Sequence, residues 1–201
     1  EEQIQDLFLF VFSIVFQQPP QLMWQNISYF INISLSNYPN FINLKEFKDS
    51  FENFIQILLN WLQEPAESEL SMTETNDNIA SLLLTIISIT KLDSKEILEI
   101  ALNLFPPQDE TETESMAKRI IEIYQENKES LSVHSLSLIA AALIRFLTMN
   151  IKKKKKINID EEMVKSIMTL LKNLMNNPEI ASSVHSLFEE SPEKIEFINN
   201  L

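Results

Sequence analysis

The chain of 201 residues contains no glycine and no cysteine, and its net charge is −13. The absence of glycine excludes the glycine-rich loops that cradle nucleotide phosphates, and it disfavours β folds whose tight turns depend on that residue. The excess of acidic residues disfavours binding to nucleic acid or to an anionic membrane surface, and it favours a basic partner. Hydrophobic residues make up 45% of the chain, which is enough for a globular core.

The longest apolar run lies near the N-terminus, at residues 7–16. It is shorter than the roughly 20 residues that a membrane-spanning helix needs. Three acidic residues, Glu1, Glu2 and Asp6, precede it, where a signal peptide would carry positive charge. We therefore expect a buried helix here. Because the chain opens inside this element without a methionine, we also expect it to be the C-terminal part of a longer protein.

Helical periodicity is clearest in the segment 51–62, where apolar residues recur at the spacing of one helix face. Similar patterns along the chain predict nine or ten helices, at residues 2–17, 21–36, 45–63, 77–92, 94–105, 112–128, 131–151, 160–176, 179–189 and 192–200. Residues 64–76 and 151–158 are predicted to be loops. Because glycine is missing, we expect Asn37, Asn127 and Asn176 to take the left-handed positions that end helices.

Paired helices of these lengths form units of about 40 residues, the period of HEAT-type repeats. The segments 79–92 and 133–149 are apolar round most of their circumference, as expected for helices stacked between neighbours. The sequence therefore predicts an all-α fold: a single α-solenoid segment of HEAT-type antiparallel helix pairs over residues 1–201. A closed helical bundle is the alternative.

Residues suited to catalysis are scarce. The only histidines, His134 and His185, have no set of further ligands nearby that would complete a metal site, although Glu189 lies one helical turn after His185. A nucleophile elbow requires glycine, which the chain lacks. We therefore predict no catalytic residue, no metal site, no cofactor and no enzymatic activity. Trp24 and Trp61 are expected to be packing anchors rather than a platform for bases.

Acidic residues gather in two segments, at 64–78 and 109–114. They are interpreted either as solvated loops or as a surface that attracts a basic ligand. Two polar residues at the predicted start of the helix 77–92 are further candidates, as an N-cap and a hydrogen-bonded ladder between repeats, or as contacts to a partner. The candidate partner-binding residues are Glu67, Glu69, Glu74, Asp77, Asn78, Asp109, Glu110 and Glu112. The lysine run 152–156 is interpreted as an exposed loop that caps a helix, as a localisation signal or as a phosphate contact.

The order of five segments resembles the C-terminal part of the importin-β superfamily, the karyopherins, and most closely the branch that carries ribosomal proteins and histones. Each segment has a counterpart in the family: an inner helix with an asparagine before small and aromatic residues, a helix followed by an acidic loop, a Thr-Asp-Asn helix start, an acidic segment after prolines, and a closing Ser-Pro-Glu helix. These segments are residues 25–31, 51–62, 75–80, 104–112 and 187–201. The chain departs from the family at Ile33 and Leu35, where smaller residues are usual.

The resemblance implies a nuclear transport receptor of the cytoplasm and nucleus. Such receptors bind protein cargo, here expected to be basic, on the inner helices of a superhelix, which would include 21–36, 77–92 and 112–128. They contact Phe-Gly repeats of nucleoporins and release import cargo when Ran-GTP binds. The N-terminal repeats of the family, which engage Ran, have no counterpart in this chain. The alternative is another HEAT-repeat scaffold that holds a multisubunit complex together.

Overall fold

The computed structural model describes the backbone of residues 2–63, 69–92, 95–108, 110–153 and 160–201. This part of the chain holds ten α-helices, one 3₁₀ helix (η1) and no strand, so the all-α prediction is confirmed. The elements are α1 (Glu2–Val15), α2 (Gln21–Asn37), η1 (Pro39–Asn43), α3 (Lys45–Gln63), α4 (Glu69–Thr90), α5 (Lys95–Asn103), α6 (Glu110–Asn127), α7 (Val133–Lys153), α8 (Glu161–Met175), α9 (Pro178–Leu187) and α10 (Pro192–Asn199).

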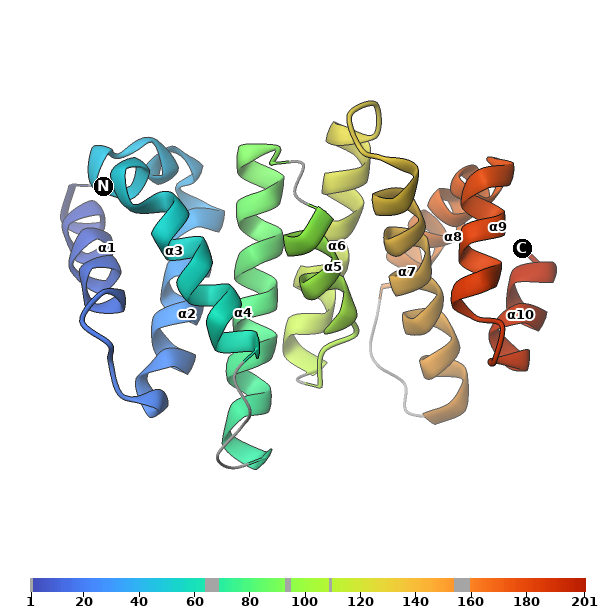
Figure 1. The fold of residues 1–201 in the computed structure, drawn as a ribbon, viewed down its shortest axis with the longest axis horizontal. Helices are drawn as coiled ribbons and strands as arrows, with labels where there is room; N and C mark the ends of the chain where they lie inside the picture. Colours follow the sequence, from blue (N-terminus) through green and yellow to red (C-terminus); the bar gives the residue numbers. More distant parts are fainter. Residues whose placement is uncertain (1, 64–68, 93–94, 109, 154–159) are drawn as a thin grey trace.

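The helices form an open row, with α1 and α10 at its two ends (Figure 1). Contacts run mainly between helices that are neighbours or next-but-one neighbours in sequence. One set, α2, α4, α6 and α8, makes successive contacts and is called the even layer below; α5, α7 and α9 contact one another in the same way. The helices therefore do not close around one axis as a closed bundle does, and the three predicted inner helices lie together in the even layer.

The predicted helix ends agree with the observed ones to within two residues, except at the start of α4. The predicted loop 64–76 is wrong from residue 69 onward, because α4 already begins at Glu69. Residues 69–76 lack helical periodicity and contain poor helix formers, which explains the error. Thr75 in this stretch is buried, so packing against neighbouring elements stabilises a helical turn that the intrinsic helix propensity of these residues does not favour. Of the predicted loop 151–158, residues 151–153 belong to α7, and residues 154–158 lie outside the described part.

In the described part of the chain, two residues take the left-handed backbone conformation that glycine usually supplies. They are Gln18, with φ of 51°, and Lys91, with φ of 55°, each shortly after the end of a helix. The prediction that asparagines would take this role is wrong, since none of the described asparagines has positive φ and Asn176 is right-handed at φ of −68°. Asparagine acts at a helix start instead: the Asn177 side chain accepts hydrogen bonds from the backbone N–H groups of Glu179 and Ile180.

The core at the N-terminal end of the row consists largely of phenylalanine. Phe12 of α1 lies at its centre, with ring centroids 4.8 Å from Phe47 and 5.1 Å from Phe54 of α3. Phe8 lies 5.1 Å from Phe41 of η1, so the connection between α2 and α3 adds a ring to the cluster. Rings at these separations add attraction beyond the burial of their area. The 3₁₀ helix, which the sequence did not predict, is therefore part of the core.

The rings of Trp24 of α2 and Trp61 of α3 contact each other at 5.0 Å between centroids, tilted by 34°, as the interpretation of both as packing anchors requires. Further along the row, α4 and α7 are the most deeply buried helices. Every residue from 77 to 88 of α4 is buried, and so is every residue from 137 to 148 of α7 except Arg145. Among the described helices, none is long and apolar enough to cross a membrane.

We predict that Phe12→Ala lowers the free energy of unfolding by about 3–5 kcal/mol, because it removes a ring at the centre of the aromatic cluster. Phe10→Ala, on the same helix, is the matched control. Phe10 is 63% exposed, so its removal should change stability by less than about 0.5 kcal/mol. Denaturant unfolding followed by circular dichroism measures both, and equal losses would contradict the assignment of Phe12 to the core.

Candidate functional site

The acidic candidate residues do not form one exposed cluster. Glu74 on α4 is exposed, whereas Glu112 on α6 is half-buried. Glu69 and Glu110 are the first residues of α4 and α6, and only their backbone is described. Glu67 and Asp109 lie outside the described residues.

Asp77 and Asn78 are not surface residues. They are 3% and 7% exposed, and they lie within α4 rather than at its start, so their prediction as N-cap residues is wrong. The Asp77 Oδ2 atom accepts a hydrogen bond of 2.9 Å from the backbone N–H of Gln108, just before α6. Asn78 Nδ2 donates to the backbone carbonyl of Gln25 on α2, at 3.2 Å. Both residues therefore link neighbouring helix pairs, which is the ladder that their pattern predicted, and their burial removes them from a partner's reach.

The polar ladder continues along α4 toward its C-terminal end. Asn32 of α2 donates from Nδ2 to Ser81 Oγ at 2.9 Å, and its Oδ1 accepts from Thr85 Oγ1 at 2.7 Å. Ser81 in turn donates to Glu112 Oε2 of α6 at 3.1 Å. Asn32, Ser81 and Thr85 are at most 4% exposed. We use the name polar ladder for the residues Asn32, Asp77, Asn78, Ser81, Thr85 and Glu112. It connects α2, α4 and α6.

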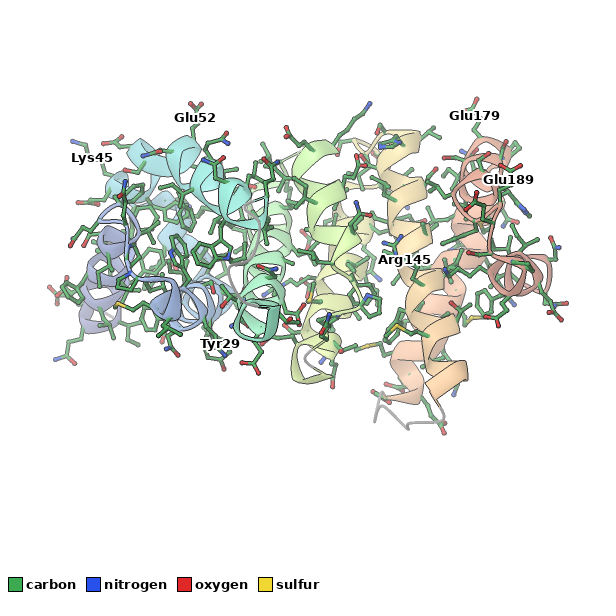
Figure 2. All side chains as sticks on the ribbon, turned by 60° about the horizontal axis from the view of Figure 1, so that its bottom comes forward. Tyr29, Lys45, Glu52, Arg145, Glu179 and Glu189 are labelled. Atoms are coloured by element: carbon green, nitrogen blue, oxygen red, sulfur yellow. The ribbon has the colours of Figure 1, made fainter. Side chains whose placement is uncertain are left out.

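An exposed apolar strip on α2 was not recognised in the sequence. Leu22, Tyr29 and Ile33 are 80%, 48% and 43% exposed. Their spacing of seven and four residues places them on one helix face, which we call the α2 strip. In Figure 2, Tyr29 projects from the edge of the molecule opposite Lys45 and Glu52 of α3. The sequence signal was present, because these residues fall outside the buried face of α2 formed by Ile27, Ile31 and Leu35.

A carboxylate is held beside the α2 strip. Gln25 lies between Leu22 and Tyr29 on the same side of α2, and its Nε2 donates to Glu74 Oε2 of α4. The bond fixes the exposed Glu74 side chain next to the strip. Neighbouring apolar side chains with an acidic group at their border can bind a peptide that presents both an apolar and a basic side chain.

The histidines give no catalytic arrangement. His134 Nε2 lies 3.7 Å from Glu99 Oε2, and both side chains are about half exposed. Across the described residues, no group of histidine, aspartate and glutamate side chains could hold a metal ion. The solvent face of α6 consists largely of paired charges, including Lys118–Glu114 and Arg119–Glu122, each at 2.7 Å. The exposed Lys118–Glu114 pair contributes little stability, and both pairs cancel part of the local charge.

The pKa of Lys118 is raised, first by its hydrogen bond to Glu114 and then by the attraction of that carboxylate.

Comparison with known proteins gives no match to a family model, to a curated protein or to a solved structure.

We predict that Asn32→Ala destabilises the protein by about 1–3 kcal/mol, because it leaves buried hydroxyl groups of α4 without their partner. Asn26→Ala, on the exposed side of the same helix, should change stability by less than about 0.5 kcal/mol. Denaturant unfolding of both variants measures the difference. A double-mutant cycle with Thr85→Val should give a coupling energy of at least about 0.5 kcal/mol, and strict additivity would refute the ladder's role.

Proposed function

We propose that the chain is a segment of an importin-type nuclear transport receptor that binds protein cargo for passage through the nuclear pore under the control of Ran-GTP. The observation that carries the proposal is the α2 strip with Glu74 held at its border. It lies on a helix that the family resemblance assigns to cargo binding. A basic cargo segment would place apolar side chains on Leu22, Tyr29 and Ile33 and a lysine or arginine beside Glu74.

The packing supports a HEAT-type solenoid as the framework for this function. Helices contact mainly their neighbours along the row, so each pair depends on local contacts. A net charge of −13 favours encounter with a basic cargo at a distance and predicts that binding weakens as salt rises. A HEAT-repeat scaffold of a multisubunit complex would share the packing, but it would not need Ran-GTP to release its partner.

The full-length protein should therefore bind a basic cargo, such as a histone or a ribosomal protein, and Phe-Gly repeats of a nucleoporin. Ran-GTP should release the cargo, whereas Ran-GDP should not. Pull-down from purified components measures each step. Binding of the cargo without any response to Ran-GTP would favour the scaffold, and failure to bind all three would overturn the receptor proposal.

The double variant Tyr29→Ser with Ile33→Ser should weaken binding of a basic cargo about tenfold or more, because it removes two exposed apolar contacts. Leu187→Ser on α9 is the matched control: Leu187 is 51% exposed and lies at the other end of the row. Calorimetric titration at two salt concentrations measures both variants. Equal affinities for the double variant and the unaltered protein would exclude the α2 strip as the cargo site.

A further inference from the structure

The two arginines of the sequence, Arg119 and Arg145, lie in different surroundings. Arg119 is half-buried on α6, but its charge is paired with Glu122 at 2.7 Å. Arg145 is the half-buried residue in the otherwise buried stretch of α7, so a charge stands where the helix is apolar on every other side. Removing a charge from water costs free energy, so a half-buried guanidinium needs hydrogen-bond acceptors or an opposite charge to offset that cost.

The guanidinium of Arg145 is only partly satisfied by the protein. Its Nη2 donates to the backbone carbonyl of Leu102 at 2.8 Å. Among the described residues, no carboxylate lies within ion-pair distance of it. Burial lowers the Arg145 pKa, and no neighbouring charge opposes that effect. Since a guanidinium has five N–H donors, most of them are left for another acceptor.

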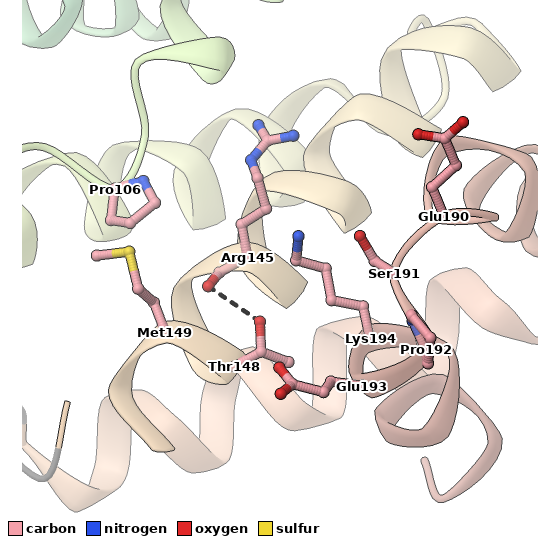
Figure 3. Close-up of a pocket in the computed structure, with 9 residues that line it drawn as sticks. All are labelled: Pro106, Arg145, Thr148, Met149, Glu190, Ser191, Pro192, Glu193 and Lys194. Carbon is pink, nitrogen blue, oxygen red and sulfur yellow. Dashed lines mark hydrogen bonds between the residues drawn. The ribbon is translucent and has the colours of Figure 1, made fainter. Parts of the chain in front are cut away.

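Arg145 lines a pocket of about 550 Å³ between α7 and the start of α10. Ser191 and Lys194 line the same pocket, and Figure 3 shows their polar ends pointing in the same general direction as the Arg145 guanidinium. Ser191 occupies the N-cap position of α10, yet its hydroxyl makes no capping hydrogen bond. The Lys194 ammonium lies 4.9 Å from the centre of the Phe188 ring, which holds it at the pocket wall. Two cations and a hydroxyl thus line one cavity.

Two acidic residues, Glu190 and Glu193, also line the pocket. Their charges repel any anion, and they repel a doubly charged phosphate more strongly than a singly charged carboxylate. A planar carboxylate also matches the fork of a guanidinium and can accept two parallel hydrogen bonds from it. The composition of the pocket therefore favours a carboxylate on a ligand of low total charge.

We propose that the pocket between α7 and α10 binds the carboxylate of an acidic side chain on a partner polypeptide, with Arg145 as the principal ligand and Ser191 and Lys194 as supporting ligands. This site is separate from the proposed cargo surface. It lies toward the opposite end of the row from α2, and it selects the opposite sign of charge (Figure 1).

The test uses the Nε–Hε signals of the two arginines in a ¹⁵N–¹H NMR spectrum, assigned with Arg145→Gln and Arg119→Gln. The protein is titrated with a blocked tripeptide, acetyl-Ala-Glu-Ala-amide. The Arg145 signal should shift and saturate, while the Arg119 signal stays in place. The same peptide with glutamine for glutamate should leave both signals unchanged, and inorganic phosphate should bind more weakly than the glutamate peptide.

Backbone amide signals give the affinity of each variant. Arg145→Gln should weaken binding of the glutamate peptide about tenfold or more, because charge-assisted hydrogen bonds are lost. Lys194→Gln and Ser191→Ala should each weaken it several-fold, and Glu190→Gln should strengthen it. Arg119→Gln, with the same change of charge and residue type, should leave the affinity unchanged.

Tighter binding of phosphate than of the glutamate peptide would overturn the assignment of a carboxylate. Equal shifts with the glutamate and glutamine peptides would overturn the site as a whole, and so would unchanged affinity in the Arg145, Lys194 and Ser191 variants. Thermal unfolding of each variant identifies any that is misfolded. The lysine and serine variants alter exposed or half-buried side chains, so they test the pocket even if Arg145→Gln proves unstable.

Discussion

The burial of residues 77–88 of α4 is the constraint on which the even layer depends. These residues have no solvent-exposed side, yet they include Asp77, Asn78, Ser81 and Thr85. Polar groups in such a position must find partners within the protein, because each one left unpaired costs about 1–3 kcal/mol. Helices α2 and α6 provide those partners, chiefly through Asn32 and Glu112. The hydrogen bonds hold only in one alignment, so they fix the position of three helices along their axes as well as their separation.

The sequence predicts the helices well because most of them show an apolar face and an identifiable end. Pro178 and Pro192 are the first residues of α9 and α10, and the predicted starts at 179 and 192 lie within one residue of them. The start of α4 was missed because polar and acidic residues there have no periodicity, although tertiary contacts stabilise the helix. The sequence also could not indicate which polar residues would be buried: Asp77 and Glu74 look alike in the chain, but one is enclosed and the other faces solvent.

The positions that matter for binding were recognised only in part. The helix 21–36 was expected to be an inner helix, but the sequence analysis did not separate the exposed apolar residues of α2 from the buried ones, since both occur on the same helix. Arg145 had a clearer signal: a single charge inside the apolar segment 133–149. That no carboxylate of the described residues pairs with it became visible only when α7, α10 and the chain before α6 were placed in space.

The polar ladder also makes the row stiffer against bending in one direction than in the other. Hydrogen bonds such as those of Asn32 fail once the donor and acceptor separate by a fraction of an ångström, whereas apolar contacts can slide while they stay buried. Bending that opens the gap between α2 and α4 on the ladder side must break these bonds, and bending that is absorbed in the aromatic contacts of α1 and α3 need not. The N-terminal part of the row therefore behaves as an elastic element whose resistance depends on the sense of its curvature.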